Sequence, residues 1–158
     1  MEAYPQPELN TLFKQYTRQR IWEIWQAGKN AEPLNAEDSR LYEVMERHLQ
    51  YGKIWDRLDE ATDDDVLQGG VNVVLHVLFH QMVENQIAED DPPAVRQVMR
   101  VLLQKGLKEH EAAHAIASVI AFEIFDMMKN NRMFDVQRYI RELRKLPLQV
   151  KAAPHRNQ

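Results

Sequence analysis

The sequence predicts an all-α fold, a single-domain helical bundle of about five to six helices. Apolar residues recur at spacings of three and four along almost the whole chain, which is the period of an α-helix. The alternation of apolar and polar residues that marks strands is nearly absent. Glycine and proline number only 5 and 7 among 158 residues, so the connections between helices are short. We expect residues 1–150 to form the domain and residues 151–158 a disordered tail.

In the first part of the chain, helices are expected over residues 8–27 and 36–51, and a shorter one over 53–60. Gly28 and Gly52 follow the two longer segments and are expected to end them. Asn35 is expected to cap the second helix, with Asp38 at its third position. Residues 61–70, ATDDDVLQGG, are expected to form a loop or a single turn.

In the second part, Asn72 is expected to cap a helix over residues 73–88, which ends at EDDPPA. The next helix begins at Pro92-Pro93 and runs to residue 105. A long helix follows over residues 108–130, and an amphipathic one over 135–146 that Pro147 is expected to stop. Within the long helix, Glu123 is expected at the helix edge, although a buried carboxylate with a partner is the alternative.

Composition excludes several classes of function. The net charge of −4 argues against a dedicated nucleic-acid binder. The absence of cysteine excludes disulfides, iron–sulfur clusters and thiolate zinc sites. No apolar run is long enough for a membrane span, and the N-terminus does not resemble a signal peptide, so a cytoplasmic location is expected. The sequence contains no phosphate-binding loop, no HExxH motif and no nucleophile elbow.

Histidines form the one constellation that points to chemistry. Residues 71–85 read VNVVLHVLFHQMVEN, which places His76, His80 and Glu84 at intervals of four. His110 and His114 repeat the spacing in KEHEAAHAI. Residues four apart lie on one face of a helix, so two imidazoles can converge on one ion. Because eight residues span about 12 Å of helix, one helix cannot complete the site and the second must supply ligands.

These spacings predict a site for a divalent transition metal, with His76, His80, Glu84, His110 and His114 as ligands. Imidazole and carboxylate donors suit zinc or iron best, with nickel as a further candidate. A closed shell would make the site structural, whereas an open position would allow redox or hydrolytic chemistry. Whether the protein is an enzyme stays open. The alternative function is a metal-free helical interaction protein, for instance a homodimer, whose core histidines are hydrogen-bonded.

His48 also falls on the apolar side of its predicted helix. A packing role is expected for it, and a role as a further ligand or as a partner of one is the alternative. The last helix is basic through Arg138, Arg141, Arg144 and Lys145, which we interpret as a solvated face.

The histidine motifs resemble those of a bacterial family of small helical proteins known as domain of unknown function 1841. The family's first motif, His-x3-His-x3-Glu-x-Gln with its preceding residues, corresponds to Asn72, Leu75, His76, His80, Glu84 and Gln86. The family's Pro-Pro turn corresponds to Pro92 and Pro93, and its Glu-His-x3-His motif to Glu109, His110, His114 and the following Ile116. Val73 stands where the family usually has proline, and His48 and Tyr51 alone remain of a further histidine motif. The resemblance implies a helical protein that could hold a metal, and it implies no reaction.

Overall fold

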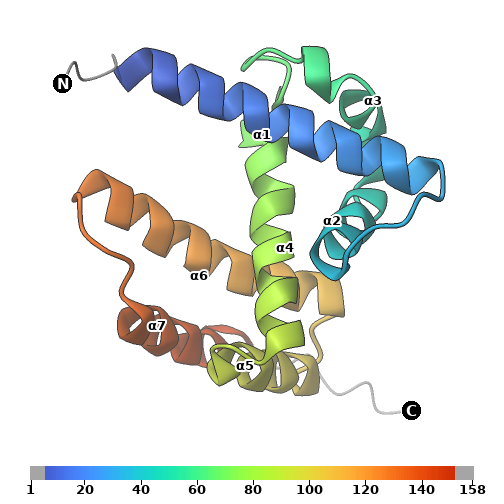
Figure 1. Ribbon diagram of the computed structural model, residues 1–158. Helices are drawn as coiled ribbons and strands as arrows, with labels where there is room; N and C mark the ends of the chain where they lie inside the picture. Colours follow the sequence, from blue (N-terminus) through green and yellow to red (C-terminus); the bar gives the residue numbers. More distant parts are fainter. Residues whose placement is uncertain (1–5, 152–158) are drawn as a thin grey trace. The chain divides into compact units, whose positions relative to one another are not determined.

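The computed structural model describes residues 6–151, and their side chains from Lys14 onward; most of the predicted tail lies outside the described residues. The chain divides into two compact units, Met1–Leu78 (unit 1) and Phe79–Gln158 (unit 2). The all-α prediction is confirmed: the described part contains seven α-helices, one more than the upper prediction, and a single two-stranded hairpin (Figure 1). Within residues 6–151, no helix has the length and apolar character needed to cross a membrane.

Unit 1 holds the first helices, the hairpin and the start of helix α4. Its elements are α1 (Gln6–Lys29), α2 (Ala36–Glu46), a 3-10 turn (Leu49–Tyr51), α3 (Gly52–Trp55), a second 3-10 turn (Leu58–Glu60), β1 (Leu67–Gln68), β2 (Val71–Asn72) and the first residues of α4 (Val73–Glu89). The buried core gathers side chains from all of these helices, including Ile24, Met45, Trp55, Leu58 and Val77. Each fully buried apolar side chain of this size contributes about 1.5–3 kcal/mol to folding.

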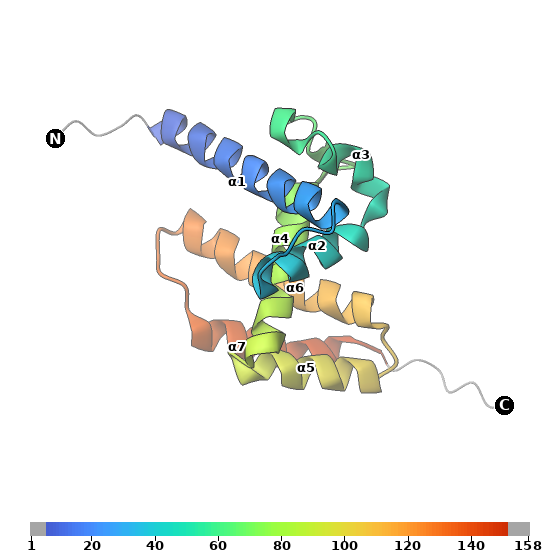
Figure 2. The same ribbon diagram turned by 45° about the vertical axis from the view of Figure 1, so that its right-hand side comes forward.

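Unit 2 consists of the rest of α4 and three further helices. These are α5 (Pro93–Gln104), α6 (Glu109–Lys129) and α7 (Val136–Gln149). Helix α5 packs against both α6 and α7, and the two views show these helices side by side (Figures 1 and 2). A second core lies among them and includes Val83, Val95, Leu102, Ile116 and Leu143.

The hairpin sets the residue at which helix α4 begins. Gly69 and Gly70 have φ values of 57° and 80°, the left-handed conformation that a two-residue hairpin turn needs and that glycine adopts without strain. The strands pair antiparallel, with Leu67 opposite Asn72. Asn72 Oδ1 then accepts the backbone N–H groups of Val74 and Leu75, each at 3.1 Å. The predicted cap of α4 is therefore confirmed.

Gly28 does not end helix α1, contrary to the prediction. The helix continues to Lys29, and the left-handed residue after it is Ala31, with φ 54°. Gly28 instead makes room for an aromatic ring, because a Cβ at this position would lie 2.2 Å from Cδ2 of Tyr42. The ring of Tyr42 in turn lies 5.4 Å from that of Trp25. The glycine thus serves the contact between α1 and α2.

Two other predicted boundaries were also wrong. Helix α2 ends at Glu46, and Gly52 opens α3 in a right-handed helical conformation where an end was expected. Pro147 lies inside α7. A proline has no N–H to donate, so this turn loses one helical hydrogen bond. At the same end of α7, Lys105 Nζ donates to the carbonyl oxygens of Pro147 and of Val150.

Glu123 is a buried carboxylate with partners, so its predicted place at the helix edge was wrong. Its side chain is 1% exposed. Oε1 accepts from Arg132 at 2.7 Å, and Oε2 lies 3.4 Å from Nε of Arg138. Both arginines also bind Asp126, and the hydrogen bond from Arg132 is the main cause that lowers the pKa of that carboxyl group. This cluster joins the end of α6 to α7.

Tyr139 connects α7 to the second part of α4. Its side chain is fully buried in unit 2, and its hydroxyl donates to Oε1 of Gln86 at 2.7 Å. Burial raises the pKa of the Tyr139 hydroxyl above its usual value, so this donor keeps its proton across the physiological range. The bond helps to hold the helix that carries His80.

Replacing Gly28 by alanine tests the contact with Tyr42. We expect Gly28→Ala to lower the free energy of unfolding by about 1–3 kcal/mol, because the added methyl group overlaps the ring. Gly52→Ala is the matched control: no heavy atom lies within 4 Å of its added Cβ, so it should be neutral or stabilise by about 0.4–1 kcal/mol. Urea unfolding of both variants measures this. Equal effects at the two positions would contradict the role given to Gly28.

Candidate metal centre

Helix α4 carries two histidines on successive turns. It runs without a break from Val73 to Glu89, so His76 and His80 lie one turn apart on the same face. His76 is half-buried and lies in unit 1, while His80 is 3% exposed and lies in unit 2. Each of them contacts further histidines within its own unit.

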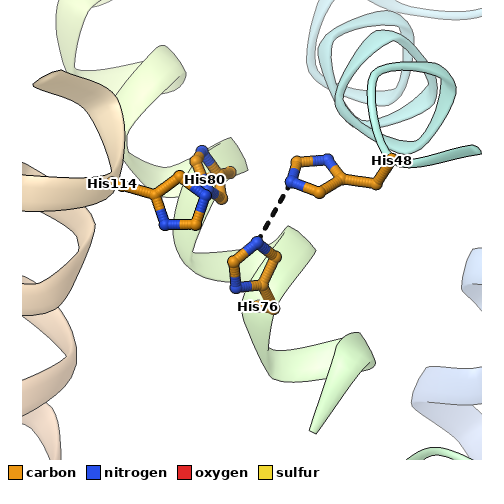
Figure 3. Close-up of side chains that lie close together, drawn as sticks. All are labelled: His48, His76, His80 and His114. Atoms are coloured by element: carbon orange, nitrogen blue, oxygen red, sulfur yellow. Dashed lines mark hydrogen bonds between the residues drawn. The ribbon is translucent and has the colours of Figure 1, made fainter. Parts of the chain in front are cut away.

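In unit 1, His76 meets His48 at the end of helix α2. Their Nε2 atoms lie 3.0 Å apart, and the rings meet edge to face with centroids 4.8 Å apart (Figure 3). His48 is 2% exposed. The ring of Tyr51 lies parallel to that of His48, with centroids 6.4 Å apart. Both nitrogens of His48 are occupied, because Nδ1 lies 2.7 Å from the carbonyl oxygen of Val44.

These contacts fix the protonation of the His48 ring. A carbonyl oxygen only accepts hydrogen bonds, so Nδ1 of His48 must carry a proton and donate to Val44. In a neutral imidazole, the other nitrogen then presents a lone pair. The hydrogen between the two Nε2 atoms therefore belongs to His76, and His48 accepts it.

In unit 2, the imidazole of His80 on α4 lies against two imidazoles of α6. The ring of His80 stacks on that of His110, with centroids 5.4 Å apart, and meets that of His114 edge to face at 4.4 Å (Figure 3 for His114). His110 and His114 meet each other at 4.5 Å. Nitrogens of His80 and His114 lie within 4.8 Å of each other. Two nitrogens on one tetrahedral zinc ion are about 3.3–3.4 Å apart.

The start of helix α6 positions the second histidine pair. Glu111 accepts the backbone N–H of Lys108 at 2.8 Å, which fixes the first turn. Ala112, Ile116 and their neighbours bury one side of the helix in the core of unit 2. His114 is half-buried and His110 exposed, so one ring of the group reaches solvent.

The structure brings together most, but not all, of the predicted ligands. Within unit 2, His80 joins both His110 and His114. Glu84 lies half-buried on α4 one turn after His80, and its role as a ligand stays a prediction. Histidines among the described residues could hold a metal ion.

His48 is the residue whose importance the sequence prediction underrated. A packing role was expected for it, but its ring nitrogens form hydrogen bonds with both His76 and Val44. The available signal was its place on the apolar side of the predicted helix over residues 36–51, because a buried imidazole needs hydrogen-bond partners for both nitrogens.

The sequence pattern that defines the family described as a domain of unknown function (DUF1841) matches residues 13–145. The chain belongs to this family. All five histidines described above fall inside the matched range. No curated protein and no solved structure matches the chain.

The donor set of this DUF1841 domain decides which ions it could hold. Neutral imidazoles bind zinc, iron, nickel and copper well, whereas magnesium and calcium prefer oxygen ligands. Imidazole donors thus favour this group of ions as a whole and not one member of it. The described histidines are therefore compatible with a metal ion.

The tautomer of His48 can be measured directly. In the metal-free protein, we expect the proton of neutral His48 on Nδ1 and the lone pair on Nε2, because Val44 offers only an acceptor. Long-range proton–nitrogen NMR spectra of the imidazole rings distinguish the two tautomers. A spectrum with the single proton on Nε2 would contradict the hydrogen bond to Val44.

Proposed function

We propose that the DUF1841 domain binds a divalent transition metal through the histidines of α4 and α6. His80 and His114 are the central ligands, and His110 is the third. Glu84, one turn of α4 after His80, is the further candidate ligand within unit 2. His76 is the sequence-predicted ligand that lies in unit 1. Zinc and iron suit these donors best, and nickel is a further candidate.

The group of three rings in unit 2 carries this proposal. Each neutral imidazole has one lone pair on its unprotonated nitrogen, and a metal ion can bind several such lone pairs at once. His80 comes from α4, while His110 and His114 come from α6, so the group joins two elements distant in sequence. An ion there would add to the stability of unit 2.

The exposure of the three rings bears on what the ion would do. His80 is buried, His114 half-buried and His110 exposed, so the group extends from the core of unit 2 to its surface. Three protein ligands would leave a position for water or substrate, as in catalytic zinc sites. A fourth protein ligand would close the shell and make the site structural. The number of ligands thus separates an enzyme from a structural metal protein.

The metal content of the wild-type chain tests the proposal. Protein purified without a nickel column should contain close to stoichiometric metal by mass spectrometry of the elements. The double variant His80→Ala/His114→Ala should contain almost none. His155→Ala is the matched control, since it removes an imidazole that lies outside both His-x3-His motifs of the sequence. His114→Ala alone, at a half-buried position, serves if the double variant does not fold.

Thermal unfolding with and without chelator gives an independent test. An ion bound to the folded state stabilises it, so a strong chelator should lower the Tm of the wild-type chain. The double variant should show no such shift. A wild-type protein that lacks metal and is indifferent to chelator would instead support the metal-free alternative, an interaction protein or homodimer, which stays a prediction.

A further inference from the structure

The end of helix α2 is built around the ring of His48. Arg47 makes a regular helical bond to Glu43, N to O 3.1 Å, but the backbone N–H of His48 turns to Met45 at 3.0 Å. In a continuing helix it would donate to Val44, four residues back. The carbonyl oxygen of Val44 instead accepts a hydrogen bond from Nδ1 of the His48 ring, with the two atoms 2.7 Å apart. The carbonyl of Val44 thus lacks its helical bond from the backbone N–H of His48 and instead orients the imidazole of the same residue.

The His48 ring is buried, and its Nε2 faces His76. Only 2% of His48 is exposed, and Tyr51 lies parallel to one of its faces. With Nδ1 held by Val44, the lone pair of Nε2 points at Nε2 of His76. Both residues lie in unit 1, on α4 and at the end of α2.

This arrangement has the features of a metal-binding histidine. Such a residue binds the ion through one nitrogen and donates its other N–H to a carbonyl or carboxylate, which fixes the tautomer and makes the ligand more basic. Val44 provides that acceptor. The separation of 3.0 Å between the two Nε2 atoms is close to the value of about 3.3–3.4 Å for two nitrogens on one tetrahedral zinc ion.

We propose that His48 is a metal ligand through Nε2, paired with His76, and that the carbonyl of Val44 presets its tautomer. The inference rests on the proposed function, because it assigns a further ligand to a metal-binding domain. On binding, His76 moves its proton from Nε2 to Nδ1 by exchange with solvent, and His48 needs no rearrangement. No net proton is released by two neutral imidazoles.

Cadmium-113 bound to the full-length wild-type chain tests this assignment. A scalar coupling between cadmium and Nε2 of His48 in NMR spectra of nitrogen-15-labelled protein is the expected result, and a residue that only packs or positions His76 cannot produce it. Cadmium that couples to other histidines but not to His48 overturns the inference and leaves the proposed function standing. A wild-type chain that binds neither cadmium nor zinc overturns both.

Zinc titrations of variants give the second arm. His48→Gln should weaken zinc binding by roughly 100-fold or more, beyond the 10–100-fold typical of residues that only support a ligand. Leu49→Ala, at the neighbouring position where the side chain is 67% exposed, is the matched control and should bind as the wild type does. Equal zinc affinities for His48→Gln and the wild type, with unchanged circular dichroism, would also overturn the assignment.

Discussion

An imidazole that leaves water needs a partner for each of its two nitrogens, and this requirement organises the centre of the DUF1841 domain. Five histidines lie in two groups, one in each unit, and both groups use helix α4. The four-residue spacing of His76 and His80 matches the turn of the helix, so both rings leave it on the same side. The hairpin and the Asn72 cap set the first residue of α4 and so help to set this register.

The two groups meet the same requirement in different ways. His48 donates from Nδ1 to the carbonyl oxygen of Val44 in α2, which leaves the lone pair of Nε2 in a fixed direction. His80 lies against two rings of α6, of which His110 reaches solvent. The contacts of His48 fix its tautomer. The contacts of His80 bring several possible metal-binding nitrogens close together. Both arrangements occur in metal sites. A bound ion would take the lone pairs of several imidazoles, which would otherwise each need a hydrogen-bond donor.

Much of this could be predicted from the sequence, because local rules control it. The bounds of α4 and α6 and the Asn72 cap follow from helical spacing and capping residues. The approach of His80 to His114 is a tertiary contact between these two helices. Gly28 could not be interpreted correctly, since its role depends on where the ring of Tyr42 packs. His48 depends on the residue at which α2 ends, and that end is set by the 3-10 turn after it and by the burial of Trp55 and Leu58. Such tertiary contacts leave no periodic trace in the sequence.

X-ray absorption at the edge of the metal that copurifies with the wild-type chain shows whether imidazoles hold an ion. We expect nearest neighbours that are mainly nitrogen, at about 2.0–2.1 Å if the ion is zinc, with the scattering pattern of at least three imidazole rings. Neighbours dominated by the oxygen atoms of water and carboxylates, or a chain that holds no metal at all, would contradict it.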